Sequence, residues 1–157
     1  MAQIISEELG ANWKDVRVQL ASNDPKFNDP VLGAQITGGS WSTMMNFDAM
    51  SRAGAAGRMA LTEAAATMMG LPPFYKDELV VRDSVVSHPK TKKSLTFAEI
   101  VKSGKITKTF TPDELKAIKL KTPDQYTKIG VSVPQLDIPS KTNGLSLIHI
   151  SEPTRPY

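Results

Sequence analysis

The stretch MNFDAMSRAGAAGRMALTEAAATMMG, residues 45–70, is long, rich in alanine and methionine, and free of proline. Alanine and methionine are strong helix formers, and a glycine followed closely by prolines ends a helix. Gly70, Pro72 and Pro73 provide that ending. We therefore predict one long helix over residues 44–69, around which the rest of the chain is arranged.

Small residues recur at helical spacing along this predicted helix. The two rows contain Ala49, Ala53 and Gly57, and Ala53, Ala56, Ala60 and Ala64. Gly54 and Gly57 each cost about 1 kcal/mol relative to alanine inside a helix. Close packing of another backbone would offset that cost, so we expect a buried helix. The methionines are expected to fill the core rather than to bind a cofactor. They are Met44, Met45, Met50, Met59, Met68 and Met69.

The segment MAQIISEELG, residues 1–10, has an amphipathic helical pattern that begins without capping residues. Its apolar face contains Ile4, Ile5 and Leu9. Glu7 and Glu8 lie opposite this face, which predicts that they point to solvent, and Gly10 is a suitable C-terminal cap. Residues 16–20 alternate apolar and polar side chains, which predicts a half-buried strand.

The second half of the chain contains short elements of both kinds. Residues 80–86 predict a strand, residues 89–93 a turn, and residues 96–99 a capping box that opens a helix. A second capping box lies at residues 111–114, with Pro112 at the first helical position. The fold class expected from this order is α+β, with short strands and helices around one long helix.

Composition excludes several function classes. The 157 residues fit one domain, and a net charge of +3 is too small to indicate nucleic acid by itself. Without cysteine, the chain supplies no disulfide, thiolate metal site or iron–sulfur cluster. Only His88 precedes the last thirteen residues, and we interpret it as structural. We therefore assign no catalytic residue and no metal ligand.

The stretch GAQITGGSWST, residues 33–43, is the one concentrated polar feature. Gly38 and Gly39 allow a sharp bend or close approach, and hydroxyls surround them. Successive backbone N–H groups at such a bend can form a concave anion site, strengthened by the dipole of the following helix. An ordinary capped turn fits the same residues, so both interpretations stay open.

Several motifs occur in an order that resembles a known family. They are IISEELGANWKDVRVQLA, DPVLGAQITGGSWS, MSRAGAAGRMALTEAAA, LKTPDQYTKIG and QLDIPSKTNG. Together they resemble the molybdopterin-binding large (beta) subunit of the bacterial xanthine dehydrogenase and aldehyde oxidase superfamily. The resemblance is to the isoquinoline 1-oxidoreductase beta-subunit type, and it covers residues 1–144 as a partial molybdopterin-binding domain.

The resemblance implies that Thr37, Gly38, Gly39 and Ser40 bind the molybdenum cofactor through its pterin and phosphate part. Gln35 and Ser42 are further cofactor-binding candidates, although the following stretch, WSTMMNFDAM, is more apolar than is usual in the family. The implied cofactor is molybdenum-molybdopterin, in a cytosine dinucleotide form in many members. The implied reaction is oxidative hydroxylation of N-heterocycles or aldehydes, and [2Fe-2S] clusters lie on a separate small iron–sulfur subunit.

Both ends of the chain depart from the family. A glycine–glutamine–glycine loop would precede residue 1, and a hammerhead-like module and the catalytic glutamate would follow residue 144. Residues 145–157 instead resemble the translation of a sequencing adaptor, and we expect them not to be native. We therefore expect an inactive fragment of marginal stability. Without the beginning of the subunit, the sequence does not decide between a periplasmic and a cytoplasmic location.

Two other functions remain open from the residues alone. The glycine–hydroxyl segment could serve a small non-catalytic domain that binds an anion or a partner protein. The lysines at positions 90, 92 and 93 and within residues 116–121 could bind nucleic acid, although the basic residues lack interleaved aromatic side chains.

Overall fold

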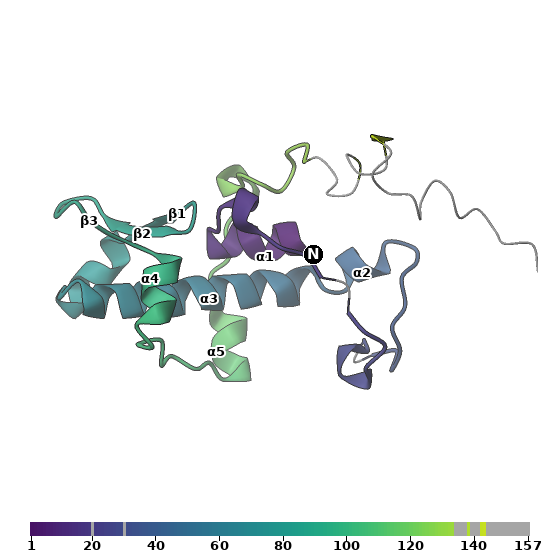
Figure 1. Cartoon of the computed structure of the whole chain (residues 1–157). Helices are drawn as coiled ribbons and strands as arrows, with labels where there is room; N and C mark the ends of the chain where they lie inside the picture. The colour runs from purple at the N-terminus through teal and green to yellow at the C-terminus, as the bar shows by residue number, and fades with distance from the viewer. Residues whose placement is uncertain (20, 30, 134–137, 139–141, 144–157) are drawn as a thin grey trace, which may run out of the picture.

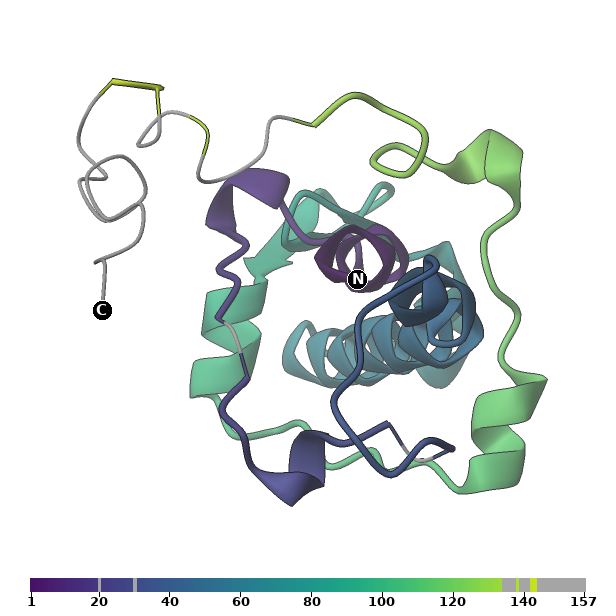
Figure 2. The ribbon, with the colours of Figure 1, turned by 90° about the vertical axis from the view of Figure 1, so that its right-hand side faces the viewer.

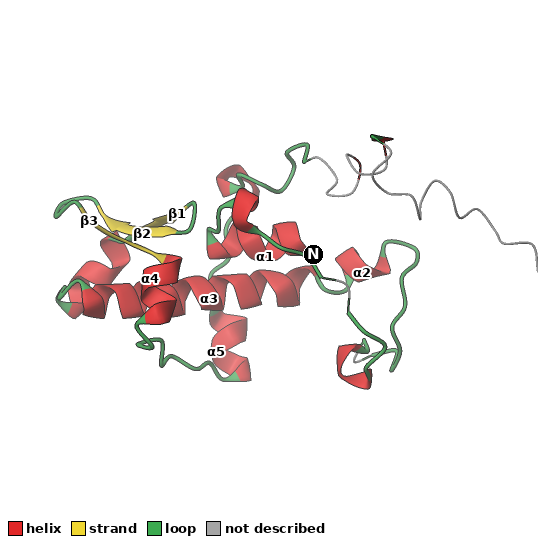
Figure 3. Ribbon diagram, in the orientation of Figure 1, coloured by secondary structure: helices red, strands yellow, loops and turns green. Residues whose placement is uncertain are grey.

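The computed structural model describes residues 1–19, 21–29, 31–133, 138 and 142–143. The α-helices and strands, in chain order, are α1 (Ala2–Leu9), α2 (Trp41–Met44), α3 (Phe47–Met68), β1 (Val80–Arg82), β2 (Val85–His88), β3 (Lys93–Thr96), α4 (Phe97–Lys102) and α5 (Pro112–Ala117). Figures 1 and 3 show α3 as a central rod, with α1 beside it and the small sheet over its C-terminal end. The predicted α+β class is confirmed. The adaptor-like residues 145–157 lie outside the described residues.

The long helix forms as predicted over most of its length but begins later. α3 starts at Phe47, after the separate short helix α2. Asn46 lies between them, and its side-chain amide donates to the carbonyl oxygen of Ser42 at 3.1 Å. A side chain that donates to the carbonyl four residues earlier competes with the backbone N–H groups that would continue the helix. The C-terminal end follows the sequence, since Gly70 adopts a left-handed conformation with φ of 67°.

Helix α1 packs closely against the small residues of α3. A Cβ atom added at Gly54 would lie 2.6 Å from the carbonyl oxygen of Ile5, and one at Gly57 would lie 3.0 Å from Leu9 Cδ1. The expected close packing is therefore confirmed at both glycines. Ala49 and Ala53 are exposed, so only Gly57 of the first predicted row faces α1. Figure 2, turned by 90°, shows α1 directly beside α3.

The strands form an antiparallel meander in the order β1-β2-β3. The predicted strand over residues 80–86 is wrong in one respect, because Asp83 and Ser84 have φ of 48° and 65° and turn the chain between β1 and β2. This turn is anchored on the end of α1. Ser84 N–H donates to the Gly10 carbonyl at 2.9 Å, and Asn12 N–H donates to Ser84 Oγ at 2.8 Å. The anchor depends on contacts that no local pattern encodes.

The core lies between the C-terminal half of α3, the sheet and α4. Its buried residues are Leu61, Ala64, Ala65, Met69, Val86 and Ile100. Both predicted capping boxes form, at Thr96 with Glu99 and at Thr111 with Glu114.

Two expectations about the core and its surroundings are wrong. Met44, Met45 and Met59 are more than 40% exposed, so they are not core residues. The described residues 16–19 form no strand. An alternating pattern becomes a strand only when a neighbouring strand exchanges backbone hydrogen bonds with it, and residues 16–19 pair with none of β1, β2 and β3.

Candidate functional site

The glycine–hydroxyl segment forms a tight turn ahead of α2. Trp41 N–H donates to the Gly38 carbonyl at 2.7 Å, and Gly39 and Ser40 between them have φ of 51° and 60°. Two consecutive left-handed residues are strained for L-amino acids other than glycine. The space around the turn is open, because a Cβ atom added at Gly38 or Gly39 would meet nothing within 4 Å.

The turn exposes donors that the described part of the chain does not use. The backbone N–H groups of Gly38, Gly39 and Ser40 have no acceptor among the described residues. The side chains of Thr37 and Ser40 are exposed. All these donors are neutral, because residues 33–43 contain no lysine or arginine. The residues present therefore suit the oxygen atoms of an anionic group approached from solvent.

Gln35 and Ser42 stand apart from this set. The Gln35 side-chain nitrogen donates to the carbonyl of Ser22 at 2.8 Å and to that of Asp24 at 3.3 Å, which fixes the preceding loop. Ser42 is half-buried within α2. The expected dipole contribution of the long helix is absent at the turn, since only the four residues of α2 follow directly.

A second polar centre lies where the sequence predicted solvent. The side chain of Glu7 has no exposed surface. Its carboxylate accepts a hydrogen bond from Lys121 Nζ at 2.8 Å and from the backbone N–H groups of Thr127, Lys128 and Ile129. Burial by itself would raise the pKa of Glu7, but these donors outweigh it and lower the pKa from 4.5 to about 2. Glu7 thus holds the loop after α5 against α1.

Glu8 is also buried, so the predicted exposure is wrong for both carboxylates. Its Oε1 atom accepts from Lys121 N–H at 2.9 Å, and its Oε2 atom lies 3.6 Å from the guanidinium of Arg58. Glu8 lies four residues after Ile4, so helical geometry places it on the buried face of α1 beside Gly54, but its partners at positions 58 and 121 are distant in sequence. Amphipathic patterning identifies one buried face, whereas α1 is covered by α3 on one side and by residues 121–129 on another.

His88 is buried, and the structural role predicted for it stays a prediction. Its Nδ1 atom accepts from the Thr91 N–H at 3.2 Å, and its Nε2 atom lies 3.6 Å from Glu78 Oε2 without a hydrogen bond. Within the described chain, no three histidine, aspartate or glutamate side chains gather as metal ligands do. None of the described helices combines the length and apolar character needed to cross a membrane.

Comparison with known proteins identifies the domain. Residues 1–146 match the model of the molybdopterin cofactor-binding domain. The chain belongs to this family. The resemblance predicted from the ordered motifs is therefore confirmed, and the domain is homologous to the large subunits of molybdenum hydroxylases.

Three curated bacterial relatives match nearly the whole chain. Membrane-bound aldehyde dehydrogenase [pyrroloquinoline-quinone] of Gluconacetobacter polyoxogenes is 38% identical over 96% of this chain. The beta subunit of isoquinoline 1-oxidoreductase from Brevundimonas diminuta is 30% identical over 92%, and a nicotinate dehydrogenase subunit from Pseudomonas putida is 32% identical over 95%. The matched region spans 18%, 22% and 12% of these relatives' lengths, respectively.

Proposed function

We propose that this chain contributes part of the cofactor site of a molybdenum hydroxylase through the turn formed by Thr37, Gly38, Gly39 and Ser40. The supporting observation is the open turn itself. Its backbone N–H groups have no acceptor among the described residues, and no neighbouring atom fills the space above its glycines. Gln35 and Ser42 would contact the cofactor at the margin of the site, through the side-chain oxygen of Gln35 and the hydroxyl of Ser42.

The chemistry of the turn suits the anionic part of a molybdopterin cofactor. N–H and O–H donors bind phosphate oxygens, and the missing side chains at Gly38 and Gly39 allow the group to approach the backbone. We propose the cytosine dinucleotide form. The bound cofactor would supply the redox chemistry for hydroxylating an N-heterocycle or an aldehyde, the substrate classes that the relatives' names contain.

The proposal includes a second polypeptide. These 157 residues contain no cysteine and so provide no cluster ligand, and we propose that the [2Fe-2S] clusters lie on a separate subunit. Two of the three relatives are named as subunits, which supports assembly with a further subunit, and we propose that this is a small iron–sulfur subunit. We assign no catalytic acid or base to this chain.

The test uses Gly38→Val, with Thr43→Val as the matched control. Gly38 does not have a positive φ and its surroundings are empty, so valine would fill the approach to the turn without disturbing the fold. Molybdenum would be measured by mass spectrometry of the purified protein, and cytidine monophosphate after acid hydrolysis. We expect both to be lost in Gly38→Val and retained in Thr43→Val.

Full molybdenum and nucleotide content in Gly38→Val would refute the assignment of the turn. Pyrroloquinoline quinone in place of molybdenum in the unmodified protein would refute the assignment of the cofactor. Binding of inorganic phosphate at the turn with neither cofactor present would instead favour the alternative function, a non-catalytic anion-binding domain.

A further inference from the structure

A group of cationic side chains lies away from the glycine–hydroxyl turn, where α3 faces the segment after α5. The side chains of Arg58, Lys119, Lys121 and Gln125, together with Leu120, line a cleft of about 400 Å³. Arg58 projects from the middle of α3, and the other residues come from one continuous segment. No carboxylate lines this cleft in the described structure.

The guanidinium group of Arg58 has N–H donors that no described residue uses. Its guanidinium side chain is 24% exposed and has one charged neighbour, Glu8 Oε2 at 3.6 Å. That distance is too long for a hydrogen bond, and the Glu8 oxygen itself has no hydrogen-bond donor. Among the described residues, nothing accepts a hydrogen bond from the Arg58 guanidinium. A fixed planar group of N–H donors is therefore available at the edge of the cleft.

The segment opposite Arg58 supplies three more donor groups. Lys119 is exposed and has no ion-pair partner among the described residues. The ammonium group of Lys121 donates to the backbone carbonyl and to the carboxylate of Glu7, and these bonds fix the position of the lysine side chain. The Gln125 side-chain oxygen accepts from Thr122 N–H at 3.0 Å, so its amide nitrogen remains free to donate.

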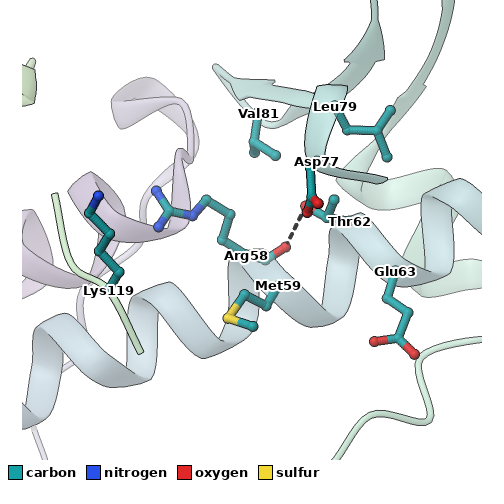
Figure 4. A pocket seen from close by; sticks show the side chains of 8 residues that line it. All are labelled: Arg58, Met59, Thr62, Glu63, Asp77, Leu79, Val81 and Lys119. Atoms are coloured by element: carbon teal, nitrogen blue, oxygen red, sulfur yellow. Dashed lines mark hydrogen bonds between the residues drawn. The ribbon is translucent and has the colours of Figure 1, made fainter. Parts of the chain in front are cut away.

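The adjacent carboxylates limit where an anion could sit. Glu7 and Glu8 are buried behind the cleft, and donors from residues 121–129 occupy three of their four oxygens. A larger neighbouring cavity of about 630 Å³ shares Arg58 and Lys119 but also contains Glu63 and Asp77. Figure 4 shows the two cationic groups at one end of that cavity and the two carboxylates at the other. Only the end toward Lys121 and Gln125 suits a negative charge.

We propose that this cleft binds the phosphate group of a small molecule, at a site separate from the Thr37–Ser40 turn. An arginine fork matches two phosphate oxygens at once, and lysine ammonium groups act as point charges on the others. The turn would bind by neutral backbone donors, whereas this cleft would bind by charge. The proposal does not depend on the cofactor function, since none of its residues belongs to the turn.

The test is a titration of the 157-residue chain with inorganic phosphate, pyrophosphate and acetate at matched ionic strength. Binding would be followed by calorimetry and by the backbone amide NMR signals of residues 119–122, 124 and 125, since Pro123 has no N–H group. The variants are Lys119→Gln, which removes an exposed unpaired charge, and Arg58→Gln. Lys105→Gln is the control, because it makes the same charge change on an exposed residue outside the cleft.

We expect pyrophosphate and phosphate to bind more tightly than acetate, and Lys119→Gln to weaken phosphate binding about tenfold, as loss of one charge-assisted contact would. Arg58→Gln should weaken it at least as much, and Lys105→Gln should bind as the unmodified chain does. Equal weakening in both lysine variants would overturn the proposal, because it would indicate a general charge effect. Acetate binding as tight as that of phosphate would overturn the ligand class. Gly38→Val should leave phosphate binding at the cleft unchanged, which separates this test from that of the cofactor.

Discussion

Replacing Glu7 with glutamine removes one negative charge from a site with no exposed surface and leaves its shape nearly unchanged. In the native protein the carboxylate accepts from Lys121 Nζ and from three consecutive backbone N–H groups. A glutamine amide has only one acceptor oxygen, and its NH₂ group would face donors rather than acceptors. We therefore expect the segment at residues 121–129 to loosen from α1.

The magnitude follows from the pKa of Glu7. A shift from 4.5 to about 2 corresponds to about 3 kcal/mol of extra stability for the folded protein at neutral pH. Removing one member of a buried ion pair typically costs about 3–5 kcal/mol, because the other charge remains without its partner. Domains of this size have total stabilities of about 5–15 kcal/mol, so the loss would be a large fraction.

The same shift predicts a pH dependence with a definite sign. Because the folded-state pKa is below the unfolded value, the stabilisation is present above about pH 4.5. It is lost as the pH falls toward 2 and the folded protein must also bind the proton. The difference between the native protein and Glu7→Gln should therefore be largest at neutral pH and nearly vanish at pH 2.

The assay is urea unfolding between pH 7 and pH 2, with Glu63→Gln as the control. Glu63 is exposed on α3, so its substitution should change stability by less than about 0.5 kcal/mol. Amide hydrogen exchange at Lys128 and Ile129 should accelerate in Glu7→Gln alone. The reasoning is refuted if Glu7→Gln unfolds at the same urea concentration as the native protein at pH 7, or if the difference persists undiminished at pH 2.

Three further predictions concern the packing of Gly54, the turn between β1 and β2, and the end of the chain. Gly54→Ala should destabilise the fold by about 1–3 kcal/mol, because the added Cβ would lie 2.6 Å from the Ile5 carbonyl oxygen. A higher unfolding temperature in this variant would mean that the better helix propensity of alanine outweighs this contact. Asp83→Gly should stabilise the fold by about 1 kcal/mol in urea unfolding, since it relieves a φ of 48°, and a loss of stability would contradict that account. Sequencing the source DNA across the codon of Gly144 should yield a continuing frame that differs from residues 145–157, whereas the same thirteen codons would show the tail to be native.

Local chemistry determined much of the secondary structure. The two capping boxes, the Gly10 cap and the end of α3 at Gly70 each depend on residues within about five positions of one another. Such features need no distant partner, so a sequence pattern is enough to locate them. The ordered motifs likewise predicted the family, because that prediction depends on the identity and order of residues and not on how they pack.

The tertiary structure alone decided which donors surround the buried carboxylates of Glu7 and Glu8. Their hydrogen-bond partners lie at residues 121–129, more than a hundred positions further along the chain, and the two segments meet only in the folded protein. The separation of β1 from β2 has the same origin, because Ser84 is held by the end of α1. A helical pattern marks which side chains avoid water, but a carboxylate is stable inside only where donors from elsewhere in the chain surround it, and no local sequence specifies that arrangement.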